Sequence, residues 1–328
     1  MVTGLPLDDV RSLLKRLPGA DATAAGEARS KAEALAVSGF AVAGAGRLGE
    51  FVASWTGRFP PRPGRAVVSL FAGTHEIARR DVSTHRPGFE QRFVEHAAAG
   101  GAPVSQICGT HDLGLKIFDL ALDVPVADIT EGPALDERGC AATIAFGMEA
   151  VAGGADLMTL GGLGEGAEVA NAALLSALVG GSPEEWLEQA DGPLAARRAE
   201  LAQKALALHG SSLRDPLEAM RRLGGRELAA ILGAILAART EKVPVVLDGL
   251  TALTAAAVLH AARRGSIDHC ILADAANPVQ ARAAAHLGIE TVMNLGMGSG
   301  DGTAGAMAMA VIRDACLVLD QTVPLPKG

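Results

Sequence analysis

The chain has 328 residues, of which 49% are hydrophobic and 20% are charged, and its formal net charge is −8. This length fits one large domain with or without a small satellite, and the composition excludes a disordered protein. The acidic balance gives no general attraction for nucleic acid or for an anionic membrane. We therefore expect no nucleic-acid partner and no membrane partner.

The cysteines and the N-terminal stretch indicate a compartment. The four cysteines are far apart and form no CxxC motif, so we expect buried thiols in a reducing cytosol. They are Cys108, Cys140, Cys270 and Cys316. The N-terminal stretch MVTGLPLDDVRSLLKRL lacks an apolar signal region, and no apolar run approaches the roughly 18 residues of a membrane span. These features predict a cytoplasmic protein.

Residues 1–62 predict a small helical domain. Leucine and valine recur at helical spacing over residues 7–17, and a second helical pattern covers residues 47–55. Pro60, Pro61 and Pro63 then form a stiff connector to the rest of the chain.

Residues 63–303 predict a large α/β domain. Short apolar runs that end in Gly or Asp alternate with helical stretches, which is typical of a parallel sheet with helices on both faces. The predicted strands are 65–73, 116–122, 155–162, 243–249, 269–274 and 290–296. Ligands of such sheets bind outside the carboxyl ends of the strands, so we expect the site at the loops that follow them.

Two of these loops are rich in glycine. The first follows the strand at 155–162 and contains Gly161, Gly162, Gly164 and Gly166; the second covers residues 296–302. Such loops can cradle a phosphate at the start of a helix, or they can simply be tight turns. Neither loop has a clean G-x-G-x-x-G pattern, which argues against a dinucleotide cofactor. Glu165 and Glu168 also place negative charge in the first loop, which opposes phosphate binding.

Asp301 is the acid of the second loop, directly before an apolar helical run. A carboxylate at this place can take a proton from a weakly acidic nitrogen, as a general base does. It can also cap the helix by accepting backbone N–H groups. The two roles are compatible, and both stay open at this point.

We expect no metal and no cofactor. Histidines and acids do occur between residues 75 and 112, but their spacing fits no metal-binding motif. The histidines are His75, His85, His96 and His111.

Several stretches together resemble a known family, the nicotinate-nucleotide–dimethylbenzimidazole phosphoribosyltransferases of cobalamin synthesis. LGMGSGDGTAGAMAM near the C-terminus is similar to the family's LGLRLGEGTGAALA, and FAGTHEIARRDVS (71–83) to its FAGDHGVAAxGVS. ADITEGPAL (127–135) also resembles its ADFTxGPAM. The resemblance covers nearly the whole chain.

The resemblance implies a fold, a reaction and an assembly. The fold is a large domain with a parallel sheet and a small helical domain built from terminal segments, here 1–62 with 304–328. In the reaction, which uses no metal, a base nitrogen attacks C1′ of nicotinate mononucleotide, nicotinate leaves, and an α-ribotide forms in cobalamin nucleotide-loop assembly. The implied assembly is a homodimer.

The resemblance also implies site residues. Asp301 matches the family's proposed base, a glutamate, with a side chain one methylene shorter. Ser83 and Gln91 match residues of the base pocket, and Met297 and Ser299 lie on the same loop as Asp301 and would border the base.

The departures from the family fall in ligand-contacting segments. The family's GEMGIGNTT reads GGLGEGAEV here, so Gly162 replaces a glutamate and residues 167–169 replace Asn-Thr-Thr. Its GRGTG reads EQADG (188–192), and its SxxSxEPGH becomes DAANPVQ (274–280). The candidate phosphate- or ribose-binding residues are Gly161, Gly162, Gly164, Glu165, Gly166, Glu168 and Asp248.

Three hypotheses follow. The first is a lower-ligand phosphoribosyltransferase with nicotinate mononucleotide and a benzimidazole-type base as substrates. The second is a catalytically impaired paralogue that binds a base, a nucleoside or a corrinoid-related ligand, or partners an active homologue. The third is a transferase that takes an unphosphorylated nucleoside, with Glu165 or Glu168 reading ribose hydroxyls.

Overall fold

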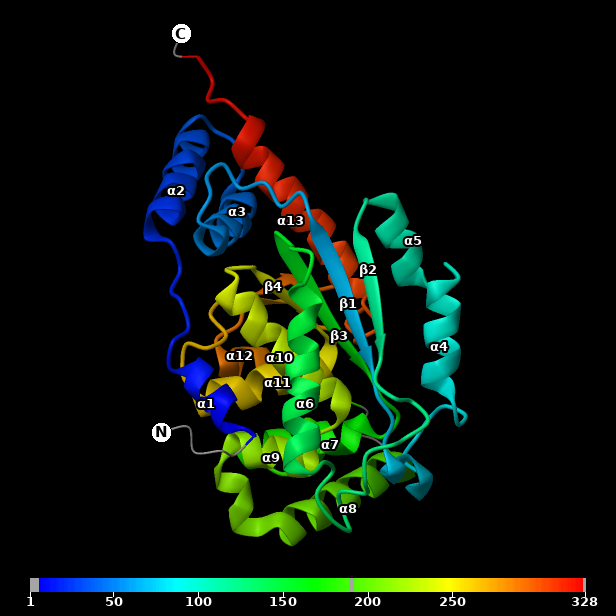
Figure 1. Cartoon of the computed structure of the whole chain (residues 1–328). Helices are drawn as coiled ribbons and strands as arrows, with labels where there is room; N and C mark the ends of the chain where they lie inside the picture. The colour runs from blue at the N-terminus through cyan, green and yellow to red at the C-terminus, as the bar shows by residue number, and fades with distance from the viewer. Residues whose placement is uncertain (1–5, 189–191, 327–328) are drawn as a thin grey trace.

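The computed structural model describes residues 6–188 and 192–326. Within these residues, six strands form one parallel sheet in the order β2-β1-β3-β4-β5-β6 (Figure 1). The strands are β1 (Ala66–Ala72), β2 (Gly114–Asp119), β3 (Leu157–Leu163), β4 (Val245–Asp248), β5 (Cys270–Asp274) and β6 (Thr291–Met293). Each strand overlaps one of the apolar runs named above, so the predicted α/β class is confirmed.

Alternate residues of the central strands point to opposite faces of the sheet. In β4, Val245 and Leu247 belong to one hydrophobic core, and Val246 belongs to the other. In β5, Leu272 belongs to the first of these cores and Ile271 to the second. Successive side chains of a strand point to opposite faces, so a strand buried on both sides has a continuous apolar sequence. Helices cover both faces, as predicted.

Two helices on the first face are in direct backbone contact. They are α6 (Glu137–Met148) and α10 (Arg226–Thr240). A Cβ atom at Gly147 of α6 would lie 1.9 Å from the carbonyl oxygen of Ala230, and one at Gly233 of α10 would lie 1.9 Å from that of Ile144. The two glycines therefore fix how closely these helices approach.

Further helices complete the first layer. They are α7 (Ala167–Leu178), α11 (Gly249–Ala262) and α12 (Pro278–Leu287), with α8 (Gly192–His209) and α9 (Pro216–Leu223) packed outside them. The opposite face is covered by α3 (Ala43–Thr56), α4 (Phe89–Ala98), α5 (Pro103–Thr110) and α13 (Thr303–Gln321).

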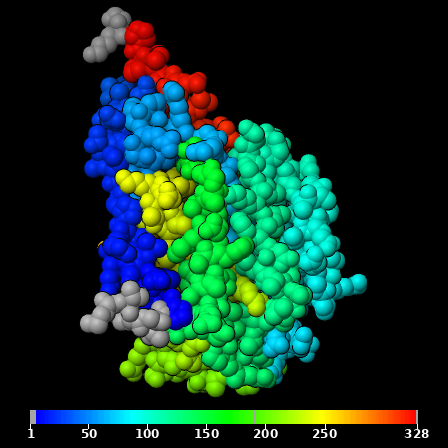
Figure 2. All heavy atoms as spheres, in the orientation of Figure 1, coloured from blue at the N-terminus to red at the C-terminus, as the bar shows by residue number. Residues whose placement is uncertain are grey.

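The last helix joins the sheet to the N-terminal helices. Ala304 and Ala306 of α13 lie in the core against the sheet, whereas Leu319 packs with Ala28 and Leu35 of α2 (Ala22–Val37). Figures 1 and 2 show α2, α3 and the end of α13 together at one end of the molecule. This arrangement agrees with a helical unit built from both terminal segments, and the domain boundaries stay a prediction.

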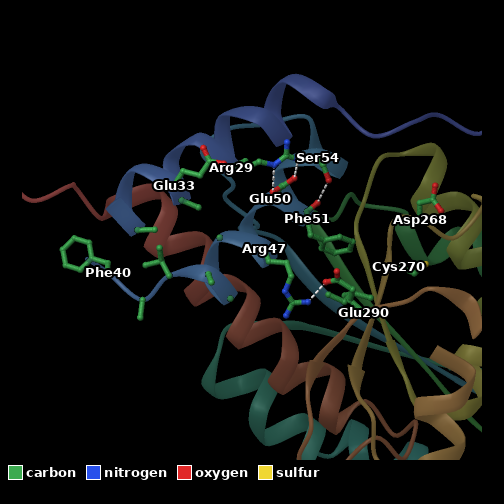
Figure 3. Close-up of a pocket in the computed structure, with 18 of the residues that line it drawn as sticks. Arg29, Glu33, Phe40, Arg47, Glu50, Phe51, Ser54, Asp268, Cys270 and Glu290 are labelled. Carbon is green, nitrogen blue, oxygen red and sulfur yellow. Dashed lines mark hydrogen bonds and ion pairs between the residues drawn. The ribbon is translucent and has the colours of Figure 1, made fainter. Parts of the chain in front are cut away.

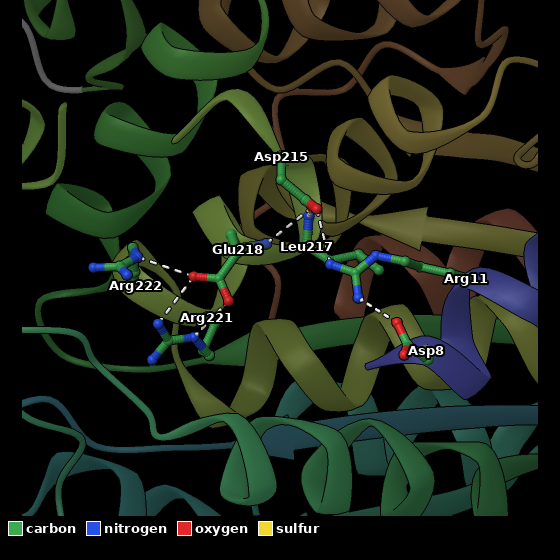
Figure 4. A network of polar contacts seen from close by, with 7 residues as sticks. All are labelled: Asp8, Arg11, Asp215, Leu217, Glu218, Arg221 and Arg222. Atoms are coloured by element: carbon green, nitrogen blue, oxygen red, sulfur yellow. Dashed lines mark hydrogen bonds and ion pairs between the residues drawn. The ribbon is translucent and has the colours of Figure 1, made fainter. Parts of the chain in front are cut away.

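The first helix packs elsewhere. Leu7, which precedes α1 (Asp8–Leu14), and Val10 within it belong to the core on the first face of the sheet. Arg11 forms ion pairs with Asp8 at 3.1 Å and with Asp215, beside α9, at 2.8 Å (Figure 4). The helix is thus held against the first face of the sheet and beside α9, away from α2 and α3. Residues 1–5 and 327–328 of the predicted helical domain lie outside the described residues.

A groove of about 860 Å³ opens at the amino ends of β5 and β6, between these strands and α2 and α3. Its arginines are paired with acids, Arg29 with Glu50 and Arg47 with Glu290 (Figure 3). This groove lies at the opposite end of the strands from the predicted ligand edge.

Two other expectations concern residue burial and helix length. All four cysteines are buried free thiols, as predicted. In the part of the chain that the structure describes, no helix is long and apolar enough to cross a membrane.

Candidate functional site

The carboxyl ends of β1, β3, β4, β5 and β6 meet at one edge of the sheet, because all the strands run in the same direction (Figure 1). Both glycine loops lie at this edge. The first loop joins β3 to α7, and the second joins β6 to α13. The two glycine loops are therefore neighbours at the edge of the sheet where the sequence predicts the site.

The contact between the loops is close. A Cβ atom at Gly161 would lie 2.5 Å from the carbonyl oxygen of Gly300, and one at Gly300 would lie 3.0 Å from that of Gly162. The second loop thus packs directly on the end of β3, where only glycine leaves room for it.

Asp301 stands at the start of α13 and is half-buried. Its carboxylate accepts the backbone N–H of Thr303 at 2.9 Å. The N-cap residue of α13 is Gly302, and no side chain caps the helix there, so Asp301 is not the N-cap that the sequence suggests. Its Oδ1 instead bonds the first helical residue from the position before the cap. The role of Asp301 as a base stays a prediction.

Asp248, at the end of β4, is fully buried beneath the same loop. Its carboxylate accepts the N–H groups of Gly300 at 3.3 Å and of Gly305 at 2.9 Å. Burial raises the pKa of Asp248 to about 7, although the backbone N–H bonds oppose the rise, and the negative charge of Asp301 adds to it. Asp248 therefore holds the loop in place through hydrogen bonds. It is not exposed to bind a ribose or a phosphate, as the sequence had suggested.

Asp274 and Gln280 hold the other end of the loop. Asp274, fully buried at the end of β5, accepts the N–H groups of Leu295 and Met297. Gln280 donates to the carbonyl of Gly298 and to Glu188, each at 2.6 Å. The segments around 188 and 274–280 both depart from the resembled family, and here they contact each other. Residues 189–191 of EQADG lie outside the described residues.

Gly162 lies within β3, where the family pattern has a glutamate. A Cβ atom there would lie 2.8 Å from Cγ2 of Thr251 and 2.9 Å from Cδ1 of Ile231. The space that a longer side chain would need is filled by these two neighbours.

A buried ion pair lies under the first loop. Nε2 of His75 is 2.9 Å from Oε1 of Glu227, at the start of α10, and the two side chains are 1% and 0% exposed. Burial lowers the pKa of His75, but the charge and hydrogen bond of Glu227 outweigh it, so the pKa is raised. A Cβ at Gly164 would lie 3.2 Å from Nε2 of His75, so this glycine lets the loop cover the pair.

The two acids of the first loop are both paired. Glu165 contacts Nδ1 of His85, and Glu168 accepts from Arg198 at 2.8 Å. Burial raises the pKa of Glu165, whereas the contact with His85 opposes the rise. The backbone N–H of Glu165 donates to Glu90 at 2.6 Å, and Glu90 is only 2% exposed. Gly166, with φ of 92°, is the N-cap residue of α7 and lies between these two acids.

The four candidate base-binding residues lie in two segments. Ser83 hydrogen-bonds the backbone of His85 at 3.0 Å, and Gln91 of α4 donates to Glu95 at 2.6 Å. Met297 packs against the core on the second face of the sheet, which also contacts Phe93 of α4. Ser299 is exposed on the same loop as Met297. Their role in binding a base stays a prediction.

Among residues 6–188 and 192–326, no group of three or more His, Cys, Asp or Glu side chains is arranged to hold a metal ion. The acids and histidines of the first loop instead pair with one another and with Arg198.

Comparisons with known proteins decide the family. The phosphoribosyltransferase family model matches residues 17–325. A nicotinate-nucleotide–dimethylbenzimidazole phosphoribosyltransferase of Rhizobium etli (strain CIAT 652) is 48% identical over 318 residues, which are 96% of this chain and 94% of that protein. This chain belongs to the nicotinate-nucleotide–dimethylbenzimidazole phosphoribosyltransferase family.

Other members of the family are similar as well. A protein of the same name from Sinorhizobium medicae (strain WSM419) is 47% identical over 95% of this chain and 94% of its own length. The crystal structure of the phosphoribosyltransferase of that name from Thermus thermophilus superposes with a TM-score of 0.84 at 26% identity, over 92% of this chain and 97% of that one. Sequence and fold thus agree on this phosphoribosyltransferase family.

Sequence reasoning did not single out several residues around the two glycine loops. Glu90, Glu227 and Arg198 lie by the first loop but come from distant segments. Asp274 and Gln280 hold the second loop and belong to the stretch 274–280, which departs from the family pattern. Asp274 also had a signal of its own, because it ends an apolar strand just as Asp248 does. Glu90 and Arg198 lie in charged helical stretches that look like ordinary solvent-exposed faces.

Proposed function

We propose that this protein transfers the phosphoribosyl group of nicotinate mononucleotide to a benzimidazole-type base, which gives an α-ribotide and free nicotinate. The proposal rests chiefly on the 48% identity, over 96% of the chain, to the Rhizobium etli enzyme of that name. The same similarity supports small-molecule substrates.

Asp301 supplies the chemistry in this proposal. Its carboxylate accepts the proton of the base nitrogen as that nitrogen attacks C1′, and nicotinate leaves with the electron pair of the broken C1′–N bond. One carboxylate oxygen accepts the N–H of Thr303, the first residue of α13, which orients the group. The three groups that fasten the loop, Asp248, Asp274 and Gln280, then position Asp301 at the carboxyl edge of the sheet.

The test is a single-turnover reaction. The protein is mixed with nicotinate mononucleotide and dimethylbenzimidazole, and chromatography measures free nicotinate and the α-ribotide. We expect both products in equal amounts. If neither forms while the Rhizobium etli enzyme works alongside, the proposal is rejected.

The impaired paralogue has no comparable support. Relatives 46% to 48% identical to this chain bear the name of the phosphoribosyltransferase. The crowding at Gly162 shows only that Thr251 and Ile231 fill the space beside it.

A homodimer is part of the proposal. Val311 and Leu317 of α13 are 41% and 50% exposed, as expected for side chains that a second subunit covers. Light scattering at several protein concentrations tests it, and a constant monomer mass would count against it.

A further inference from the structure

A second cavity, of about 610 Å³, lies between α1, α9 and the end of α11. Volumes of about 300–1,000 Å³ are usual for sites that bind small molecules. Five charged side chains line the cavity, those of Arg11, Lys15, Arg214, Asp215 and Arg263, and four of the five are cationic. The chain as a whole has a net charge of −8, so this concentration of positive charge is local.

The cavity is remote from the candidate active site. α11 begins at Gly249, where a Cβ atom would lie 2.6 Å from the backbone nitrogen of Gly300 in the second glycine loop. The helix ends at Ala262, which lines the cavity. Its 14 residues span about 21 Å. A ligand in the cavity is therefore distinct from a substrate at the carboxyl edge of the sheet.

Some of the charges around the cavity are already balanced. Arg11 pairs with Asp8 at 3.1 Å and with Asp215 at 2.8 Å (Figure 4). Glu218 pairs with both arginines in the last turn of α9, at 2.9 Å and 3.0 Å. These arginines are therefore neutralised by neighbouring acids.

Three cations of the lining lack such an acid among the described residues. Arg263 donates to the carbonyl of Leu14, which is a neutral group. Within residues 6–188 and 192–326, Lys15 and Arg214 have no hydrogen-bond or ion-pair partner. Ammonium and guanidinium groups offer donors and no acceptors. The three side chains therefore suit an anion that presents several acceptor oxygens.

The rest of the lining is apolar. Leu14 and Leu217 are 4% and 2% exposed and belong to the core on the first face of the sheet, and Pro216 and Ala262 line the cavity beside them. A bare phosphate ion is far smaller than this cavity. An apolar body attached to the anion would cover the apolar lining and remove it from water.

We propose that the cavity binds a phosphate monoester with an apolar body. The phosphate lies against Lys15, Arg214 and Arg263, and a guanidinium group can bind it through two parallel hydrogen bonds. The apolar body lies on Leu14 and Leu217. The ligand thereby joins α1 to α9 and α11, and it does so whether or not the protein carries out the proposed transfer.

The experiment measures binding to the full-length protein by calorimetry with three probes: phenyl phosphate, inorganic phosphate and benzoate. We expect phenyl phosphate to bind at least about tenfold more tightly than either of the others. Inorganic phosphate lacks the apolar body, and benzoate carries a single negative charge. The affinity for phenyl phosphate should also fall as salt is added, because the charges that bind it are near the surface.

Two substitutions test the residues. Lys15→Gln and Arg214→Gln should each weaken the binding of phenyl phosphate about threefold to fivefold, as expected for an ion pair near the surface. Both side chains are exposed, so the variants should fold normally, which circular dichroism checks. Lys204→Gln, at an exposed position of α8 outside the cavity, is the matched control and should leave the affinity unchanged.

Hydrogen exchange, measured by mass spectrometry, locates the ligand. Phenyl phosphate should slow the exchange of α1 and of the start of α9, because it joins the two. Exchange in the glycine loops at 161–166 and 296–302 should not change. Slower exchange at these loops alone would place the ligand in the candidate active site and overturn the inference.

Three other results would overturn it. They are no binding of phenyl phosphate, inorganic phosphate or benzoate binding as tightly as phenyl phosphate, and unchanged affinity in both Lys15→Gln and Arg214→Gln. None of these measurements depends on turnover. A protein that fails to make the α-ribotide can therefore still confirm the cavity as a binding site, and an active enzyme can still refute it.

Discussion

Asp248 lies directly beneath the turn that carries Asp301, and its carboxylate bonds the N–H groups of Gly300 and Gly305 on either side of that turn. The buried carboxylate thus ties the end of β4 to the start of α13. Any change in its charge acts on the backbone on both sides of the candidate base.

The protonation of Asp248 predicts a pH-dependent stability. Burial raises its pKa from the ordinary 3.8 to about 7, so the fold favours the protonated form. Its stabilisation is therefore complete below about pH 3.8 and is lost as the pH rises through about 7. Relative to Asp248→Asn, the free energy of unfolding of the unsubstituted protein should fall by up to roughly 4 kcal/mol between pH 4 and pH 8. Urea unfolding at a series of pH values checks this, and parallel curves for the two proteins would contradict it.

Asp301→Asn should abolish transfer without loosening the fold. Asparagine keeps a side-chain oxygen that can accept the N–H of Thr303, so the unfolding temperature should change little. It cannot take the proton of the base, and the single-turnover rate should fall about 100-fold or more. Asp314→Asn, on an exposed position of the same helix, is the control. A rate unchanged by Asp301→Asn would exclude Asp301 as the base and leave it only its hydrogen bond to Thr303.

Gly162→Ala should be costly although it adds only one carbon. The new Cβ would lie within 3 Å of Thr251 and Ile231, and overpacking of this kind costs about 1–3 kcal/mol. Gly26→Ala in α2 is the matched control, because no atom lies within 4 Å of the added carbon. It should stabilise the protein by about 0.5–1 kcal/mol. Chemical denaturation compares the two, and equal effects would show that β3 has free space.

The His75–Glu227 pair predicts a strong and pH-dependent effect. Glu227→Gln leaves His75 buried without its anion and should cost about 3–5 kcal/mol. The pKa of His75 is raised in the fold, so its stabilisation is full below the ordinary 6.5 and is lost as the pH rises through the folded value. The cost of Glu227→Gln should therefore be smaller at pH 9 than at pH 6. A cost that is equal at both values would mean that His75 does not titrate between pH 6 and pH 9.

The sheet and its ligand edge could be predicted because they depend on local patterns. An apolar run such as that at 243–249 predicts a strand and also predicts that Asp248 lies at its carboxyl end. Asp301 can likewise be recognised as the acid of a glycine loop. The charged cluster of the first loop could not be predicted in this way. Glu90 meets Glu165 across 75 residues of sequence, and His75 meets Glu227 across 152. Nothing in a helical pattern indicates which of its acids is buried by another segment.

The same limit applies to the negative charge of Glu168. From the sequence alone, this charge is expected to repel a phosphate. In the structure its charge is balanced by Arg198, a residue of the outer helix α8 whose burial depends on the tertiary fold.

The close approach of α6 and α10 at Gly147 and Gly233 has a consequence far from where it occurs. α10 carries Glu227 in its first turn, so the crossing point of α6 and α10 sets the height at which this carboxylate meets His75. A methyl group at either glycine would push the helices apart and lift Glu227 away from the first loop. A screen of random variants should therefore find substitutions at positions 147 and 233 that abolish activity. Neither position lies in a glycine loop of the candidate site.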